Sequence, residues 1–282
     1  MKRLVFLVGI LLLGCTSVRA ADTLRIATYN IQYPAAEPSW RAKRLPAIKQ
    51  LLKDWPFDVF GSQEPFLPQL EDMMDAIGDR YAWVGDCTSG NNKDRKTHFN
   101  PIFYRKDRLK LLDHGVIWFY GEPGIKKWDS DAPRMCVWAK FKDKKSGKVF
   151  YEFNCHFDHK GKNARIESAK MLIPEIQRIC AGKPFFVNGD FNCLEDSKPY
   201  ALLQNSGIMS DAMTAVPAPV NAEYYSMSHY KPLDTVPKHG KHLDHIFVST
   251  GTTVCSWTMI LDHQKGNFGS DHFPIMVEWI IQ

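Results

Sequence analysis

The sequence lacks several features that would point away from an ordinary globular domain. It has no internal repeat, which excludes a solenoid or a propeller, and no low-complexity tract or long linker that would divide it. Its longest apolar run, Leu4–Leu13, is too short to cross a membrane as a stable helix. None of its seven cysteines has the spacing of a zinc site.

The chain also has little excess of one charge. It carries 36 Lys and Arg against 31 Asp and Glu, a formal charge of +5. Three of the cations, Lys2, Arg3 and Arg19, lie in the first twenty residues, which hold no acid, so the rest of the chain is near +2. That surplus is too small to indicate a nucleic acid partner by itself, so nucleic acid stays only one candidate partner.

Residues 1–20 have the layout of a secretory signal peptide, with cations first, then the apolar run, then small residues. Two processing routes fit. The segment that ends at Cys15 resembles a bacterial lipobox, whereas Val18–Ala20 resembles an ordinary signal-peptidase site. The alternative is a buried N-terminal strand or helix. We predict export (to the periplasm, the outer membrane or the medium) and one monomeric domain over residues 22–282. The two routes stay open, and a membrane anchor is expected only if Cys15 carries a lipid.

Short β-rich runs recur along this domain, and helical periodicity separates only some of them. The predicted strands are Leu24–Ile31, Val59–Gln63, Tyr81–Val84, Pro101–Tyr104, Leu109–Phe119, Cys136–Phe141, Val149–His156, Phe185–Asn188, His245–Ser249, Thr253–Ile260 and Ile275–Ile281. The predicted helices are Trp40–Lys53, Leu67–Ile77, Asn163–Ile179 and Pro199–Asn205. This pattern favours two sheets packed face to face with helices outside over a doubly wound parallel sheet. Cys136, Cys155 and Cys193 lie among apolar residues and are expected to be buried free thiols.

Polar side chains stand at the ends of many predicted strands, where binding sites tend to form. Each one taken singly is explained as well by a turn, core or loop position, and only their combination indicates a site. Asp190 and Asn192 follow the buried-type run Phe185–Asn188 and are two residues apart, so they can share one face. The complete set is Asn30, Glu64, His156, Asp190, Asn192, Asp244, Asp271 and His272.

The set contains the groups that hydrolysis of a phosphoester needs: a ligand for a metal ion, a base for water and donors to the phosphate oxygens. Glu64 offers an oxygen ligand for a hard cation, Mg²⁺ or Mn²⁺. Asp190 is the candidate base that orients and deprotonates the water. Asp244 could keep the imidazole of His272 charged. The candidate donors to phosphate are Asn192, His156 and His272.

Seven segments occur in the same order as in the endonuclease/exonuclease/phosphatase superfamily, and the sequence resembles that family from about residue 24 onward. They are TYNIQ (28–32), GSQE (61–64), PIFYR (101–105), HFDHKG (156–161), VNGDFN (187–192), LDHIFVS (243–249) and SDHFPI (270–275). The resemblance, which is greatest to bacterial secreted members, implies a four-layered α/β sandwich of two mostly antiparallel sheets flanked by helices. It also implies metal-dependent hydrolysis of phosphoesters.

The resemblance implies a role for each residue of the set. Glu64 resembles the principal metal ligand, with Asn30 and Asp271 completing or supporting the metal site. Gln32 stands where some nuclease branches carry an acid, so a second metal contact there is not expected. The other implied roles are water activation by Asp190, phosphate orientation by Asn192, phosphate binding by His156, and a carboxylate–imidazole pair of Asp244 and His272.

The expected function is that of a phosphodiesterase or nuclease-like enzyme. The alternative is a phosphomonoesterase that acts on sugar or inositol phosphates, although residues 238–245 lack the segment typical of the inositol-phosphatase branch. A catalytically inactive surface binding module would have lost residues such as Glu64, Asp190 or His272, and all three are present.

Further residues near the motifs are candidate substrate contacts. Arg134, His159 and Arg165 are the best of these, because guanidinium groups suit phosphate. The segment Tyr224–His242 is rich in Tyr, Lys and His, and it could stack a base or a sugar ring or be a loop that tends to disorder. Trp128 is interpreted as a core or rim aromatic rather than a platform for bases.

Overall fold

The computed structural model of the chain describes residues 23–34, 39–261 and 268–281. The predicted signal peptide, its two cleavage sites and Cys15 lie outside the described residues. Within these ranges, no helix is both long enough and apolar enough to cross a membrane.

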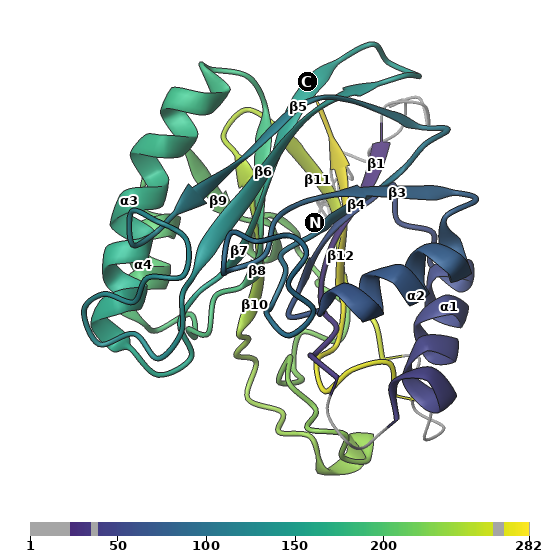
Figure 1. Cartoon of the computed structure of the whole chain (residues 1–282). Helices are drawn as coiled ribbons and strands as arrows, with labels where there is room; N and C mark the ends of the chain where they lie inside the picture. Colours follow the sequence, from purple (N-terminus) through teal and green to yellow (C-terminus); the bar gives the residue numbers. More distant parts are fainter. Residues whose placement is uncertain (1–22, 35–38, 262–267, 282) are drawn as a thin grey trace, which may run out of the picture.

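Two six-stranded sheets face each other (Figure 1). The first has the order β11 (Thr253–Met259), β12 (Ile275–Ile280), β1 (Thr23–Asn30), β2 (Val59–Gln63), β4 (Ile102–Arg105) and β3 (Tyr81–Val84). The second has the order β5 (Leu109–Trp118), β6 (Met135–Asp143), β7 (Val149–His156), β8 (Phe185–Asp190), β10 (Asp244–Ser249) and β9 (Met209–Asp211). Each sheet is antiparallel except for one parallel pair, β1 with β2 and β7 with β8. Every predicted strand is present within two residues of its predicted ends, and only the short β9 was not predicted.

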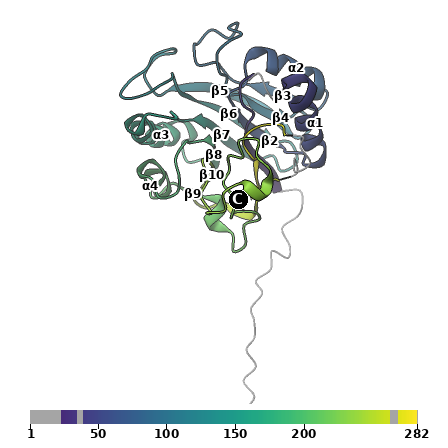
Figure 2. The same cartoon turned by 90° about the horizontal axis from the view of Figure 1, so that it is seen from below.

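The helices cover the outer faces of the two sheets. Figure 2 shows α1 (Leu45–Asp54) and α2 (Leu67–Ile77) outside the first sheet, and α3 (Lys162–Cys180) and α4 (Lys198–Gln204) outside the second. Three separate buried clusters fill the space under α1 and α2, between the sheets, and under α3 and α4. The prediction of a four-layered α/β sandwich is confirmed.

The helix predicted at Trp40–Lys53 is divided. Trp40–Arg44 forms a wider π-helical turn, in which the Arg44 amide donates to the Ser39 carbonyl, and α1 begins only at Leu45. Pro46 lies in the first turn of α1 and has no amide hydrogen to continue an α-helical ladder from the preceding turn. The wider turn buries the Arg44 side chain, which donates to the backbone oxygens of residues 31–33 and 269.

Alternation of side chains along the strands sets one face of each strand toward the space between the sheets. On β1, Leu24 and Ile26 belong to the cluster between the sheets, whereas Ala27 and Tyr29 pack under α1 and α2. Continuing by twos from Ile26, the last residue of β1 on the inner face is Asn30. The apolar core and the end of the strand are therefore on the same face.

A layer of buried amide side chains lies between the apolar core and these strand ends. Asn154 Nδ2 donates to the backbone oxygens of Ser62 and of residue 101 in the opposite sheet, at 2.8 and 2.9 Å. Gln63 Nε2 donates to Asn154 Oδ1 at 2.7 Å, and Asn188 Nδ2 donates to the backbone oxygen of Ala27 at 2.7 Å. These hydrogen bonds join the two sheets at a fixed separation directly beneath the site.

The cysteines agree with the prediction. All six that fall in the described ranges are free thiols, and Cys136, Cys155 and Cys193 are buried.

Candidate active site

Strand register places three of the predicted residues side by side in the second sheet. His156 is the last residue of β7 and pairs with Asp190, the last residue of β8. Asp244, the first residue of β10, pairs with Asp190 from the other side. All three side chains are buried. The sequence thus builds a row of imidazole, carboxylate and carboxylate simply by ending three neighbouring strands at one edge.

The first sheet contributes Asn30 and Glu64 from the ends of β1 and β2. Asn30 Nδ2 donates to Glu64 Oε1 and to Asp190 Oδ2, both at 3.0 Å, so this amide links the two sheets across the site. Glu64 has a φ of 75°, which is uncommon for a residue other than glycine. Its Oε2 accepts from the Tyr33 amide at 3.2 Å, which fixes the carboxylate.

Asp190 lies at the centre of the site. Its Oδ1 accepts from the Asn192 amide at 2.9 Å, and its Oδ2 lies 3.6 Å from His156 Nε2 and 3.9 Å from His272 Nε2. Burial, followed by the negative charge of Asp244, raises the pKa of Asp190 to about 7. A carboxyl group with this pKa can accept a proton near neutral pH, as a base for water must.

Asp244 and His272 form a buried pair, because His272 Nδ1 lies 2.9 Å from Asp244 Oδ2. Burial alone would lower the pKa of His272, but the carboxylates of Asp244, Asp190 and Asp271 together outweigh burial and raise it well above its ordinary value. His272 is therefore an imidazolium at neutral pH, with Nε2 directed toward Asp190. It can donate a hydrogen bond to an anionic oxygen.

His156 has the opposite character. Burial, and then the positive charge of Arg134, hold the pKa of His156 well below its ordinary value, so its imidazole is neutral. Its ring lies nearly parallel to that of His98, with the two centroids 6.4 Å apart, and His98 stacks in turn on the half-exposed Tyr33. His98 and Tyr33 were not predicted as site residues, because neither stands in a motif.

The candidate substrate contacts Arg134, His159 and Arg165 cluster around a carboxylate that was not predicted from the sequence. Asp158 is buried and accepts four backbone amide hydrogens, from residues 131, 132, 160 and 161, at 2.7–3.0 Å. The cluster holds Arg134 Nε at 3.7 Å from Asp158 Oδ2, and Arg134 NH2 at 3.1 Å from His159 Nδ1. Arg165 NH1 donates to the Asp158 backbone oxygen at 2.7 Å. Asp158 stands inside the HFDHKG motif, and that position was the signal that could have found it.

The structure brings together seven of the eight residues predicted for the centre and places the eighth, Asp271, beside them. Asp271 Oδ2 accepts from Gln32 Nε2 at 2.9 Å, and Oδ1 accepts from Ser270 Oγ at 3.2 Å. Tyr230, from the segment Tyr224–His242 for which a stacking role and a simple loop were both left open, donates to Gln32 Oε1. A metal-binding role of Asp271 stays a prediction. Arg44, which the structure uses to hold the loop after β1, is a structural residue that no motif identified.

The donor set fits a divalent cation. The donor atoms of Glu64, His156 and Asp190 lie within 4.8 Å of one another, as do those of Asp190, Asp244 and His272. Asp244 Oδ1 is buried and has no hydrogen-bond partner among the described residues. Buried carboxylates this close repel each other, as the raised pKa of Asp190 records, and a hard cation with oxygen ligands would relieve that repulsion. Glu64, with Asn30 beside it, is the best placed to hold the ion.

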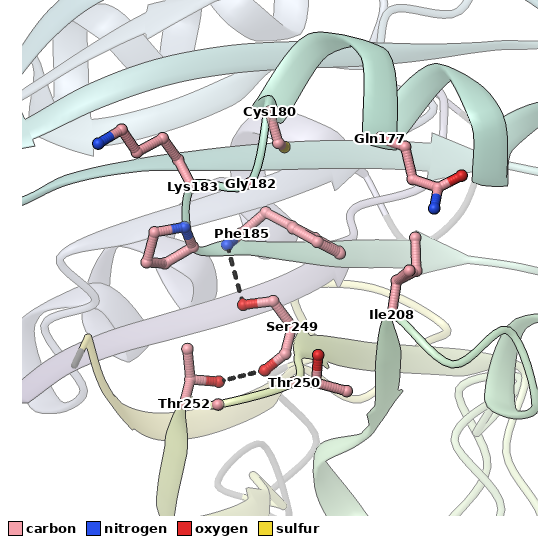
Figure 3. A pocket seen from close by; sticks show the side chains of 11 residues that line it. Gln177, Cys180, Gly182, Lys183, Phe185, Ile208, Ser249, Thr250 and Thr252 are labelled. Carbon is pink, nitrogen blue, oxygen red and sulfur yellow. Dashed lines mark hydrogen bonds between the residues drawn. The ribbon is translucent and has the colours of Figure 1, made fainter.

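A separate hollow lies elsewhere in the molecule. A cavity of about 620 Å³ opens between the C-terminal end of α3 and the end of β10, beside Phe185 and Ser249 (Figure 3). Phe185 begins β8 and Asp190 ends it, so this cavity lies about 16 Å along the strand from the catalytic row. It is lined by neutral side chains and Lys183, and it has no carboxylate. The candidate catalytic residues lie at the opposite end of β8, at Asp190.

The motif order, the fold and this geometry agree with a match over residues 27–272 to the endonuclease/exonuclease/phosphatase family. The chain belongs to this family. Members are hydrolases that act on phosphoesters with a divalent metal ion, and this chain is one of them.

Several solved structures and a curated protein are similar to it. A family member from Bacteroides thetaiotaomicron has 29% identity and a TM-score of 0.83, covering 92% of this chain and 98% of its own. A mannosyl-6-phosphatase of the same organism has 30% identity and a TM-score of 0.82, covering 92% of this chain and all of its own. The protein angel of Drosophila melanogaster is 26% identical over 194 residues, 66% of this chain. This chain spans 52% of the length of that curated relative.

Proposed function

We propose that the protein is a Mg²⁺- or Mn²⁺-dependent phosphomonoesterase whose substrate is a sugar phosphate. The observation that carries this proposal is the group of donors around the phosphate position: an imidazolium at His272, and the buried guanidinium of Arg134 beside the neutral His156. A phosphomonoester is a dianion, and it needs more positive charge in a confined site than a diester does. The similarity to a mannosyl-6-phosphatase and the charge near +2 outside residues 1–20 support the same choice.

The residues divide the work as follows. A bound divalent cation would neutralise charge on the phosphoryl oxygens. Asp190 takes a proton from the attacking water as the water oxygen bonds to phosphorus and the bond from phosphorus to the sugar oxygen breaks; the sugar oxygen leaves with the bonding pair and takes up a proton from solvent water. Asn30, which donates to Asp190 Oδ2, keeps that carboxylate in place. His272 and Asn192 donate to phosphoryl oxygens, and the charge on Asp244 keeps His272 protonated.

The test is turnover by matched variants on a panel of substrates. We expect Asp190→Asn and His272→Ala to lower kcat by several orders of magnitude without loss of the fold, while the exposed Asp113→Asn keeps wild-type activity. EDTA should abolish activity, and Mg²⁺ or Mn²⁺ should restore it. The panel compares hexose 6-phosphates, inositol phosphates, bis-p-nitrophenyl phosphate, poly(A) and plasmid DNA.

The second candidate is the phosphodiesterase or nuclease-like enzyme expected from the motifs. Faster hydrolysis of bis-p-nitrophenyl phosphate or of nucleic acid than of any hexose phosphate would establish it in place of the first. Turnover that is indifferent to EDTA would contradict both.

We also propose that the enzyme acts outside the cytoplasm. The support is the signal-like composition of residues 1–20. Fusion of these residues to a reporter that is active only after export tests the proposal, and Cys15→Ser separates the two routes. Membrane association that is lost in this variant indicates a lipid anchor, whereas unchanged soluble secretion indicates ordinary cleavage.

A further inference from the structure

The loop between β5 and β6 presents an exposed tryptophan. Residues 121–131, hereafter the Trp128 loop, contain two of the exposed large hydrophobic side chains of the described chain, Ile125 and Trp128, with exposed fractions of 42% and 47%. Side chains of this size are usually more deeply buried, and the exposed part of an indole ring leaves a flat apolar surface in water. The mechanism proposed above uses neither side chain.

The Trp128 backbone is held in an unfavourable conformation. Its φ is 55°, in the left-handed region, which costs a bulky residue about 1–2 kcal/mol. The residues around it supply the restraint. Lys127 and Ser130 exchange two hydrogen bonds at 3.1 Å, and Asp129 accepts the amides of Asn163 and Ala164 at the start of α3, at 3.0 and 2.8 Å. A side chain fixed at this cost in an exposed position suggests a binding role.

The loop leads directly into the substrate side of the active site. Three residues after Trp128, Asp131 lies 3.3 Å from His159 Nε2, and the other nitrogen of that imidazole contacts Arg134. The Trp128 ring packs edge-on against Tyr120, with centroids 5.5 Å apart. Tyr120 is buried and lies within reach of the charge of Arg134. Trp128 is therefore connected to Arg134 in two ways, through its ring contact with Tyr120 and through Asp131 and His159.

We propose that Trp128 is a stacking platform for the pyranose ring of the substrate, so that the enzyme holds the sugar by one apolar face and the phosphate by Arg134 and His272. This inference rests on the proposed function of sugar phosphate hydrolysis. One face of a pyranose carries mainly C–H groups, which pack on an indole ring, while its hydroxyl groups reach outward to charged partners. The loop offers such partners in Lys126, Lys127 and Asp131.

A lipid surface is the other occupant that an exposed tryptophan and isoleucine could suggest, and the loop is poorly suited to it. Residues 121–131 carry three acids, Glu122, Asp129 and Asp131, against two lysines. A net negative loop is repelled by anionic membranes. Membrane insertion also needs no fixed ring orientation, whereas ring stacking gains from a side chain whose position is set in advance.

The test measures binding apart from turnover. Titration calorimetry compares mannose 6-phosphate with glycerol 3-phosphate, which has no ring, on Asp190→Asn protein in Mg²⁺. We expect added Trp128→Ala to weaken mannose 6-phosphate at least tenfold more than it weakens glycerol 3-phosphate, and Trp128→Phe to restore most of the difference. Leu112→Ala, at an exposed residue on β5, is the control and should change neither affinity.

Several results would overturn the inference. Equal weakening of both ligands by Trp128→Ala would show that the loop only supports Arg134 and His159. Failure of mannose, glucose and galactose 6-phosphates to bind the Asp190→Asn protein would also overturn it. The same holds if Trp128→Ala abolishes binding to phosphatidylglycerol vesicles and leaves the affinity for sugar phosphates unchanged. If wild-type protein hydrolyses no hexose phosphate but binds one through Trp128, the proposed function fails and the stacking site stands.

Discussion

Gly61→Ala tests whether the amide layer between the sheets sets the geometry of the active site. Gly61 lies on β2 with a backbone that any residue can adopt, yet a Cβ there would lie 2.4 Å from Asn188 Oδ1 and 2.7 Å from Asn154 Cγ. Ordinary contacts lie at 3.4–4 Å, so Asn188 must move by about 1 Å. Asn188 shares its strand and its face with Asp190 two residues later, and that displacement reaches the catalytic carboxylate.

Two magnitudes follow. Overpacking of this kind costs about 1–3 kcal/mol in the free energy of unfolding, which lowers Tm by about 2–12 °C in a domain of this size. A displacement of about 1 Å of a catalytic group can lower kcat/KM about 100-fold. Differential scanning fluorimetry and steady-state kinetics at saturating Mg²⁺ measure the two effects on the same preparation.

The matched control is Gly147→Ala in the turn between β6 and β7. Gly147 has a φ of 76° and no heavy atom within 4 Å of the added Cβ, so its substitution strains the backbone by about 1–2 kcal/mol without touching the amide layer. We expect a comparable loss of stability and no loss of kcat/KM. Wild-type kcat/KM in Gly61→Ala, or an equal loss in Gly147→Ala, would refute the link between the layer and the site.

Three further predictions concern charge. Asp158→Asn can accept at one oxygen only, so it should release part of the loop that holds Arg134 and raise KM at least tenfold, more than it lowers kcat; an unchanged KM would contradict this. Because the pKa of Asp190 is raised to about 7 in the metal-free protein, Mg²⁺ affinity measured by calorimetry should fall at least tenfold from pH 8 to pH 6, and a flat profile would argue against it. Burial lowers the pKa of His245, but the Asp211 carboxylate, which accepts its hydrogen bond, acts together with the charge of Glu195 and the Cys193 backbone oxygen to raise that pKa. The pair therefore stabilises the fold below pH 6.5, and its contribution is lost as pH rises through the raised value. The Tm difference between wild type and Asp211→Asn should therefore shrink from pH 6 to pH 9; a constant difference would exclude the ion pair as its cause.

Most of the architecture was predictable from local pattern. The run Val59–Gln63 starts with a β-branched and an aromatic residue, which favour a strand, and Leu67–Ile77 has the spacing of an amphipathic helix. Both were predicted to the residue. The prediction erred at Trp40–Lys53, because a proline in the first turn of a helix is compatible with either a continuous or a divided helix until the burial of Arg44 is known. The three residues of β9 give too little pattern to be recognised.

Site residues that stand in a sequence motif could be predicted, whereas those that only the packing of the folded chain brings together could not. Asp190 and His272 stand in ordered segments, so their meeting could be expected. The stack of Tyr33, His98 and His156 joins residues from three segments with no shared motif, and the register that aligns them depends on both sheets. The same holds for Trp128, whose exposure and left-handed backbone are properties of the folded loop.

The position of the site follows from where along the strands this fold places its carboxylates. On β8, the inner face passes from the apolar Phe186 through the amide of Asn188 to the carboxylate of Asp190, because these residues follow one another by twos. Glu152, on the inner face of β7, lies deeper between the sheets: it is fully buried, and Asn188 Nδ2 donates to its Oε1 at 2.9 Å. Burial raises the pKa of Glu152 well above its ordinary value, which favours the uncharged acid at that depth. At the strand ends, Asp190 and Asp244 lie side by side on paired strands, and the amides beneath them join the two sheets. Placing the same residues one position earlier would turn each of them to the helical side, because the side-chain period of a strand is two.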